Sequence, residues 1–338
     1  MGSSGLNYRS AGVNLEEAQR ATSNIGELVR STFNSQVLDN WGQFGGCFAP
    51  DFSHLKKPVL VSSTDSVGTK LLVAIKAGIH DTIGQDIVNH CVNDILTCGA
   101  SPLFFLDYIG IGTMDAIVVE QIVKGIAIAC RENRCALIGG ELAEMPDIYK
   151  KKEYDLVGTI VGIVDHDNLI DGSSFVLGDV LVGFPSNGLH TNGYSLARKV
   201  LLDGAKFDLE KRIDDLDGTL GEKLLQIHKS YLHTVQHLLA AIEIKAMAHI
   251  TGGGLEGNIS RVVPKGMKAV IEWSAWQMPP IFALIQKQGR IATEEMRRVF
   301  NMGIGFVIGC RKEDVDQVLK ISESKGEKPM VIGEIVSM

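Results

Sequence analysis

The sequence lacks an excess of positive charge and contains no long basic run. Its 338 residues include 33 Lys and Arg against 40 Asp and Glu, which gives a formal charge of −7. An acidic chain repels nucleic acid, so we expect no nucleic-acid partner. It also repels phosphorylated small molecules, so divalent metal ions and local backbone N–H groups would have to hold them. The charge therefore predicts metal dependence for any phosphate chemistry.

Long apolar runs and paired cysteines are also missing. No stretch approaches the roughly 20 residues that a membrane span needs, and the N-terminus carries no apolar signal-peptide segment. The six cysteines, at positions 47, 91, 98, 130, 135 and 310, form no CxxC pair. We expect reduced, mostly buried thiols, a cytoplasmic protein and no membrane partner. The opening MGSSG is left out of the fold prediction.

The composition is that of an ordinary globular protein with two domains. Hydrophobic residues make up 45% and charged residues 22% of the 338 positions, which argues against disorder or a fibrous repeat. Apolar, β-branched runs predict strands at 59–62, 103–109, 136–138, 156–164, 180–184, 269–271 and 304–308. The polar stretch DHDNLIDGSS predicts a domain junction near residue 170, and hence domains 1–170 and 171–338.

Helical patterns alternate with these strands. Apolar residues at 3.6-residue spacing predict a helix over 86–97, and similar patterns predict helices over 71–77, 114–133 and 220–242. Mixed helices and strands throughout the chain indicate the α/β and α+β classes.

The stretch STDSVGTK, residues 63–70, follows an apolar strand and precedes an apolar helix. Asp65 would end the strand, Gly68 would form the turn, and Lys70 would supply a mobile positive charge. A carboxylate beside helix N-terminal N–H groups suits a metal-bound phosphate. The alternative is that Asp65 only caps the helix.

The helix predicted at 86–97 carries Asp86, His90, Asn93 and Asp94 on one polar face. Asp86 and Asp94 lie about 12 Å apart along its axis. The face is either solvated or functional. Asn93 and Asp94 favour function, because a solvated helix C-terminus would more often carry Lys or Arg.

Two glycine-rich segments add further candidates. GGELAEMP, residues 139–146, follows a short strand with Gly140, Glu141 and Glu144, and Mg²⁺ usually takes one or two carboxylates. SNGLHTNGYS, residues 186–195, places His190 and its neighbours at a helix start, where hydroxyl, amide and N–H groups form an anion-binding nest.

A third segment, GGGLEG at 252–257, matches the GxGxxG dinucleotide signature, with Glu272 near the spacing of a ribose-binding acid. It supports an alternative hypothesis, a dinucleotide-dependent oxidoreductase. The helix it would open ends before Pro264, which is short for a βαβ crossover. No GxxxxGK[ST] sequence occurs, so a P-loop ATPase is excluded.

Together the segments resemble the phosphoribosylformylglycinamidine cyclo-ligase family, also called aminoimidazole ribonucleotide synthetase. The resemblance spans nearly the whole chain and rests on YRSAGV, STDSVGTK, VNDILTCGASPLFFLDY, GGELAEMP, FPSNGLHTNGYSLARKVL, HITGGGLEGN and FNMGIGF. It implies an N-terminal α/β domain whose strands form a barrel across a homodimer, followed by an α+β domain. It also implies ATP and Mg²⁺, with K⁺ as a further candidate ion, and formylglycinamidine ribonucleotide as substrate.

The resemblance also implies roles for single residues. Asp65 and Asp94 match the metal and nucleotide contacts, and the expected catalytic residues are Asp65, Lys70, Asp94 and His190. The expected nucleotide and substrate contacts are Thr64, Gly68, Thr69, Asn93, Gly140, Glu141, Thr191, Asn192, Gly252 and Gly253. A histidine at position 249 favours the cyclo-ligase over relatives that make selenophosphate or thiamine diphosphate, which carry an aspartate there.

The chain departs from the family pattern at three places. Ser66 replaces a glycine, Asp39 and Asn40 stand in a loop that is usually glycine-rich, and the first helix lacks a lysine. Arg20 or Arg30 could substitute for that lysine. These departures support a third hypothesis, a homodimer that binds nucleotide without turnover.

Overall fold

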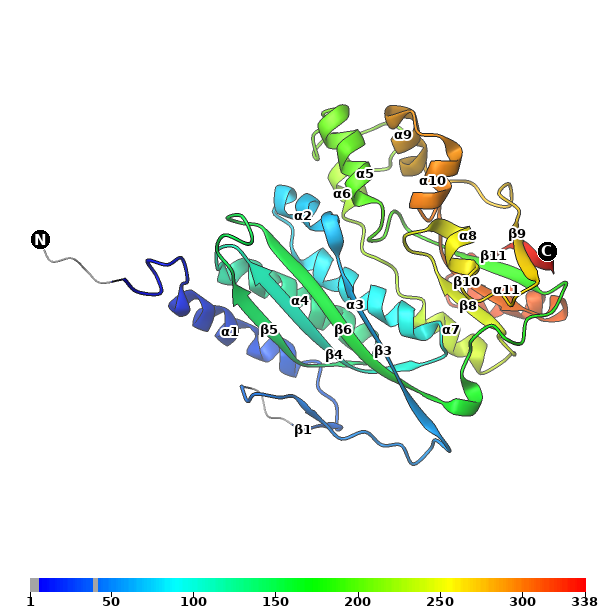
Figure 1. Cartoon of the computed structure of the whole chain (residues 1–338), viewed down its shortest axis with the longest axis horizontal. Helices are drawn as coiled ribbons and strands as arrows, with labels where there is room; N and C mark the ends of the chain where they lie inside the picture. Colours follow the sequence, from blue (N-terminus) through cyan, green and yellow to red (C-terminus); the bar gives the residue numbers. More distant parts are fainter. Residues whose placement is uncertain (1–5, 39–41) are drawn as a thin grey trace, which may run out of the picture.

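The chain folds into two sheet-based halves that share a buried interface. The computed structural model describes residues 6–38 and 42–338, so the departures at Asp39 and Asn40 lie outside the described residues. Figure 1 shows the N-terminal sheet with helices behind it, and the C-terminal sheet with its helices on the other side of the molecule. The last strand of the N-terminal sheet ends at Asp165, and the first strand of the C-terminal sheet begins at Val180.

The N-terminal half holds a four-stranded sheet of order β3-β6-β4-β5. Strands β4 and β5 are parallel and the other pairs are antiparallel. Its elements are α1 (Leu15–Arg30), β1 (Val37–Leu38), β2 (Cys47–Phe48), β3 (Pro58–Ser66), α2 (Leu71–Ala77), α3 (Asp81–Leu96), β4 (Ser101–Ile111), α4 (Ala116–Glu132), β5 (Ala136–Glu144) and β6 (Tyr154–Asp165).

The C-terminal half holds a five-stranded sheet of order β8-β10-β7-β11-β9, in which every neighbouring pair is antiparallel. Its elements are β7 (Val180–Pro185), α5 (Tyr194–Arg198), a π-helical turn (Lys199–Gly204), α6 (Leu220–Leu224), α7 (Leu232–Leu239), β8 (Ala246–His249), α8 (Gly254–Ile259), β9 (Met267–Ile271), α9 (Pro280–Gly289), α10 (Thr293–Val299), β10 (Ile304–Cys310), α11 (Val315–Ser324) and β11 (Met330–Ser337).

Helices α3 and α4 cover one face of the N-terminal sheet. The two helices approach closely at Gly84 and Gly125, where an added Cβ would collide with backbone atoms of the neighbouring helix. Asp115 caps α4 by accepting hydrogen bonds from two N–H groups of its first turn. The opposite face of the sheet is partly open. Along β6 up to Val161, burial alternates: Leu156 and Ile160 are buried against the helices, whereas Val157 and Val161 on the opposite face are half-exposed.

All seven predicted strands lie within observed strands, but two helix predictions need correction. The predicted helix 220–242 is two short helices, α6 and α7, separated by residues 225–231. The predicted helix after His190 is a short α-helix followed by a π-helical turn. No helix among the described residues is both long enough and apolar enough to cross a lipid bilayer.

Candidate functional site

The polar face of α3 is buried at the junction between the two halves. Asp86 and Asn93 are fully buried and His90 is 3% exposed, so the face is not solvated. It packs against residues 225–231, the segment that interrupts the predicted helix. Asp86 accepts a hydrogen bond from the backbone N–H of His228 at 2.6 Å. The polar face of α3 therefore fastens a C-terminal loop to the N-terminal half.

Lys70 belongs to this interface and is not a mobile charge. Its side chain is fully buried, with Nζ 2.7 Å from Asp86 Oδ2, and it donates a hydrogen bond to the carbonyl of Gln226 at 2.6 Å. An ion pair without solvent access needs both partners, because either charge left alone in the interior is strongly destabilising. The expectation of a mobile Lys70 is therefore wrong, and its contact with a nucleotide stays a prediction.

Asn93 also holds the loop. Its Oδ1 accepts from the backbone N–H of Tyr231 at 3.0 Å, and its Nδ2 donates to the carbonyl of Lys229 at 2.8 Å. These bonds satisfy backbone groups of the loop that would pair with one another in a continuous helix. The amide of Asn93 is enclosed and already paired with the loop, and its predicted nucleotide contact stays a prediction.

Asp65 and Asp94 lie together, although they are far apart in the sequence. Oδ2 of Asp65 is 2.8 Å from Nε2 of His90, and Oδ2 of Asp94 is 3.7 Å from the same nitrogen. Ser63 donates to Asp94 at 2.8 Å, and the backbone N–H of Ser66 donates to Asp65 at 2.6 Å. Their side chains are 43% and 28% exposed, so both carboxylates face a shared opening.

The histidines next to these carboxylates set their charge state. Partial burial works against ionisation of Asp65, but the hydrogen bond and charge of His90 outweigh it and lower the pKa of Asp65. Burial likewise opposes ionisation of Asp94, and His249, 2.8 Å away, lowers the pKa of Asp94 in spite of it. Both carboxyl groups are therefore ionised at neutral pH, and oxygen anions are the ligands that Mg²⁺ prefers.

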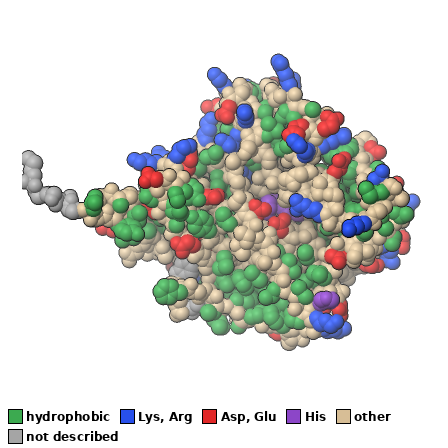
Figure 2. Space-filling view, viewed as in Figure 1, with side chains coloured by type: hydrophobic (Ala, Val, Ile, Leu, Met, Phe, Trp, Pro, Cys, Tyr) green, Lys and Arg blue, Asp and Glu red, His purple; other side chains and the backbone are tan. Residues whose placement is uncertain are grey.

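A chain of hydrogen bonds runs from His90 into the C-terminal half. Thr191 Oγ1 lies 2.8 Å from His90 Nδ1 and 3.2 Å from His228 Nδ1. His228 Nε2 lies 3.0 Å from His249 Nε2, and His249 Nδ1 donates to Asp94. In Figure 2, histidine and acidic side chains gather at the middle of the visible face, between the two halves.

His228 was missed by the sequence prediction. It lies inside an apparently regular helical pattern, which gave no signal that it marks a loop at an interface. The sequence prediction noted His90 only as part of the polar face of the helix that is now α3. It noted His249 only as a residue that distinguishes the family from its relatives. Only the folded chain brings these three histidines together.

His190 is buried behind the same cluster. Its ring stacks on that of His228 with centroids 4.1 Å apart, and neither of its ring nitrogens has a hydrogen-bond partner among the described residues. Its φ of 60° is unusual for a residue with a side chain. Burial lowers the pKa of His190 well below its ordinary value, so the ring is neutral. An unpaired neutral imidazole is available to a ligand that enters the junction.

The other C-terminal candidates line the edge of the junction. Asn192 Oδ1 accepts from the backbone N–H of Gly252 at 3.1 Å, which joins the two glycine-rich segments. Thr69 and Ser195 are linked across the halves by hydroxyl groups 3.0 Å apart. Asn192 therefore lies beside Gly252, and Thr69 lies against the C-terminal half through Ser195; their predicted ligand contacts stay predictions.

GGGLEG does not form a dinucleotide site. Helix α8 connects β8 to β9, which are not neighbours in the sheet, and the described strands of that sheet are all antiparallel. A dinucleotide fold needs a parallel βαβ unit at this place. The oxidoreductase hypothesis is therefore wrong.

Thr64, Gly140 and Glu141 lie away from the paired carboxylates. Thr64 precedes Asp65 in β3, so its side chain points to the opposite face of the sheet, where it contacts Thr159. Gly140 lies three strands across from Asp65 in the same row, about 14 Å away. The structure therefore does not bring all three acidic segments into one site.

Gly140 and Glu141 instead line a separate cavity of about 840 Å³ between the sheet, α1 and α4. Asp107 reaches into it from β4, and an added Cβ on Gly140 would collide with the Asp107 carboxyl group. Burial raises the pKa of Asp107 to about 7. Glu144 is used structurally, because its carboxylate accepts backbone N–H groups of Asn14 and Met114.

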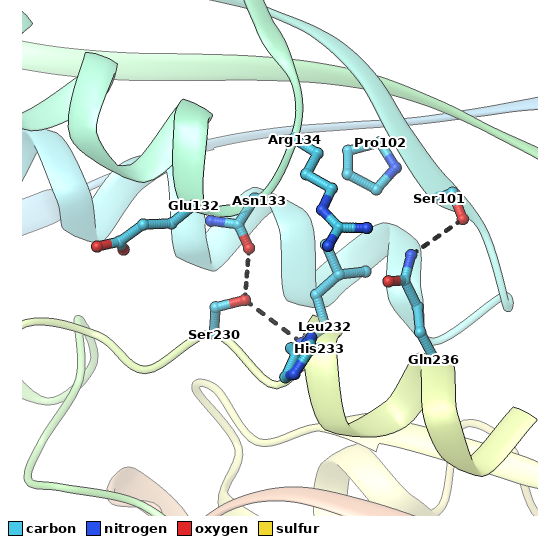
Figure 3. A pocket seen from close by; sticks show the side chains of 9 residues that line it. All are labelled: Ser101, Pro102, Glu132, Asn133, Arg134, Ser230, Leu232, His233 and Gln236. Atoms are coloured by element: carbon cyan, nitrogen blue, oxygen red, sulfur yellow. Dashed lines mark hydrogen bonds between the residues drawn. The ribbon is translucent and has the colours of Figure 1, made fainter. Parts of the chain in front are cut away.

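A smaller pocket of about 340 Å³ lies at the far end of the 225–231 loop (Figure 3). Ser230 donates to Asn133 at 2.6 Å, and Gln236 donates to Ser101 at 3.3 Å. These contacts anchor the start of α7 to α4 and β4. The pocket thus lies where the loop that carries His228 is hydrogen-bonded to the N-terminal half.

Two family models match the chain. Residues 52–164 match the AIR synthase related protein N-terminal domain, and residues 177–337 match the C-terminal domain of the same group. The chain is 47% identical over 329 residues to a phosphoribosylformylglycinamidine cyclo-ligase of Thermodesulfovibrio yellowstonii, covering 97% of this chain and 96% of that protein. It is 49% identical over 329 residues to the enzyme of that name from Bacillus cytotoxicus, with 97% and 95% covered.

Solved structures share the fold at low identity. A thiamine-monophosphate kinase of Stenotrophomonas maltophilia gives a TM-score of 0.70 at 17% identity, over 93% of this chain and 94% of that one. The hydrogenase maturation protein HypE of Escherichia coli gives 0.67 at 17% identity, over 95% and 91%. At this identity the likeness concerns the architecture alone.

Proposed function

The chain belongs to the phosphoribosylformylglycinamidine cyclo-ligase family, and we propose that its paired carboxylates, Asp65 and Asp94, hold the metal ion of the reaction. The enzyme is an ATP-dependent ligase of purine biosynthesis that converts formylglycinamidine ribonucleotide to aminoimidazole ribonucleotide, ADP and phosphate. The observation that carries the proposal is the convergence of both Oδ2 atoms on Nε2 of His90.

The donor set suits Mg²⁺. Two ionised carboxylates face one opening, and Mg²⁺ commonly takes one or two protein carboxylates and completes its shell with water and phosphate oxygens. Bound there, the ion would neutralise charge on the phosphoryl group that moves from ATP to the formyl amide oxygen. K⁺ remains a candidate that no described contact favours.

The chain's own residues position the carboxylates and enclose the substrate. His90 and Ser66 orient Asp65, and His249 and Ser63 orient Asp94, so each carboxylate is fixed from two sides. Fixed acceptors need little reorganisation as charge develops during phosphoryl transfer. Ser66 donates through its backbone, which a glycine would do equally, so this departure leaves the contact to Asp65 intact.

We place the substrate at the edge formed by His190, Thr191, Asn192 and Gly252. Once the amide oxygen carries a phosphoryl group, the amidine nitrogen attacks the former amide carbon and phosphate departs with that oxygen. The amide of Asn192, held in place by the N–H of Gly252, and the unpaired ring of His190 can orient such a substrate across the junction.

Gly140 and Glu141 suggest where the rest of the nucleotide extends. Their cavity lies about 14 Å along the sheet from Asp65, measured as three strand spacings. Phe105 and Ile87 pack over Gly158 between these two places. We propose that the phosphates lie at the carboxylates and that Gly140 and Glu141 contact the nucleotide from the cavity side, without a path along this row. Gly68 and Thr69 lie at the phosphate end.

We also propose a homodimer built through the uncovered face of the N-terminal sheet. Val157 and Val161 are half-exposed on that face and Leu60 is 61% exposed, an arrangement that favours burial against a second sheet. Figure 2 shows hydrophobic side chains gathered over this part of the molecule. The domain division near residue 170 and a cytoplasmic location complete the proposal. The free thiols of Cys91, Cys98, Cys130, Cys135 and Cys310 support the cytoplasmic location.

Incubation of the protein with formylglycinamidine ribonucleotide, ATP and Mg²⁺ tests the metal assignment. We expect equal amounts of ADP and aminoimidazole ribonucleotide, and loss of both when a chelator replaces Mg²⁺. ADP release without the imidazole product would place the metal at an ATPase step uncoupled from ring closure. Nucleotide binding with neither product would support the hypothesis of a homodimer without turnover.

A further inference from the structure

Three buried histidines from separate segments form a nearly equilateral triangle. His90 lies in α3, His228 in the loop before α7, and His249 at the end of β8. Their ring centroids are 5.2, 4.9 and 5.0 Å apart, and the rings are inclined to one another by 57° to 76°. All three are at most 5% exposed. Imidazoles arranged in this way surround a common point.

The outer nitrogen of each ring is held by an oxygen. His90 Nε2 contacts Asp65 at 2.8 Å, His228 Nδ1 contacts Thr191 at 3.2 Å, and His249 Nδ1 contacts Asp94 at 2.8 Å. Metal-binding histidines almost always donate their second nitrogen to a carboxylate or another oxygen in this manner. One nitrogen of each ring lies within 4.8 Å of the other two.

Contacts link Asp65, His90, Thr191, His228, His249 and Asp94 in sequence. Inside the cluster, Nε2 of His228 and Nε2 of His249 face each other at 3.0 Å, and Nδ2 of Asn93 lies 3.3 Å from His228 Nε2. The two flanking carboxylates balance the charge of a divalent ion.

The spacing fits a transition metal. A tetrahedral ion bound to imidazole nitrogens at 2.0–2.1 Å places the ring centres roughly 5 Å apart, as they are here. Imidazole suits Zn²⁺, Co²⁺ and Ni²⁺, whereas Mg²⁺ prefers oxygen. We propose that His90, His228 and His249 form a tris-imidazole site for a divalent transition ion, typified by Zn²⁺, that joins the two halves of the chain. Its fourth position faces the junction.

Titration of the chelator-treated full chain with Co²⁺ tests the site without any activity measurement. We expect one Co²⁺ per chain with the visible absorption of tetrahedral coordination, displaced by Zn²⁺ and unaffected by excess Mg²⁺. His228→Gln should weaken Co²⁺ binding by at least about 100-fold, because one of three ligands is lost. His249→Asn provides a second variant with the same expectation, used if His228→Gln does not give a native circular dichroism spectrum.

The chain offers a matched control. His233 and His237 lie one turn apart on α7, with their rings edge to face and ring centroids 4.7 Å apart, and could bind Co²⁺ at the surface. The double variant His233→Gln/His237→Gln should keep the tetrahedral absorption. The proposal is overturned if wild type shows no tetrahedral Co²⁺, if the ligand variants keep it, or if the control variant loses it.

Discussion

Helices α3 and α4 lie side by side, but they bury different kinds of side chain. The buried residues of α4 are apolar, including Ile122 and Ile126, and they pack on the sheet and on α3. Helix α3 buries apolar residues toward the sheet and, on another side, Asp86, His90 and Asn93 toward the C-terminal half. The comparison teaches that a polar helix face can be an interface when a loop supplies matching backbone groups.

The largest effect should come from breaking the Lys70–Asp86 pair. We expect Lys70→Met to lower the free energy of unfolding by about 3–5 kcal/mol, because Asp86 is left charged and enclosed. Ile126→Val in α4 removes one buried methylene and should cost only about 0.5–1.5 kcal/mol. Urea denaturation of both variants measures the difference. Equal costs would show that α3 and α4 are stabilised in the same way.

Asp107 sharpens the comparison, because it is a carboxyl group on the α4 side whose pKa is set mainly by burial and not by a basic partner. Its pKa of about 7 exceeds the ordinary 3.8, so the folded state keeps a proton that the unfolded chain releases. Stability should therefore fall between about pH 4 and pH 7, by on the order of 2–4 kcal/mol, and level off above. In Asp107→Asn this pH dependence should disappear. Thermal unfolding of both proteins from pH 4 to 8 measures this pH dependence. If the stability of Asp107→Asn changes with pH as it does in wild type, another group causes the effect.

Asp94→Asn tests the exposed end of the α3 face. We expect kcat to fall at least about tenfold, which corresponds to about 1.4 kcal/mol, because one charged metal ligand is lost. Glu132→Gln, at the exposed end of α4, is the matched control and should leave kcat unchanged. Steady-state kinetics at saturating Mg²⁺ would reject the assignment if Asp94→Asn behaved like wild type.

The smallest effect on folding should come from the uncovered sheet face. Leu60→Glu adds a charge to a residue that is 61% exposed in one chain, so subunit stability should change by no more than about 0.5 kcal/mol. The dimer should nevertheless dissociate, because the new carboxylate would be buried against its partner. Light scattering after size exclusion measures the mass, and a wild-type monomer or a variant dimer would contradict the proposed interface.

Much of the secondary structure was predictable because it depends on local patterns. The runs at 59–62 and 180–184 are apolar and β-branched, and both are strands. Strand β8, AMAH, was missed because alanine and methionine carry little strand signal. The prediction of one helix over 220–242 was wrong because Asp86 and Asn93 accept hydrogen bonds from backbone N–H groups of the 225–231 loop. These bonds satisfy N–H groups that a continuous helix would have paired internally.

The site was predictable residue by residue but not as an arrangement. Asp65 and Asp94 were each singled out by their position at an element end, and family resemblance supplied their role. Nothing local indicated that His228 would meet His249, or that Lys70 would be enclosed. Those contacts join separate segments: His228 and His249 are 21 residues apart, and Lys70 and Gln226 are 156 residues apart.

The sequence by itself determined the elements, the ionisable groups at their ends and the family, because periodicity and motif order are properties of the chain. Only the tertiary structure decided which of those groups lose contact with water. Charge and hydrogen-bonding capacity are set by the residue, but their energies depend on the partners and the solvent that folding leaves around them. For this reason Asp94 faces an opening and Asp86, two turns earlier on the same helix, is part of the core.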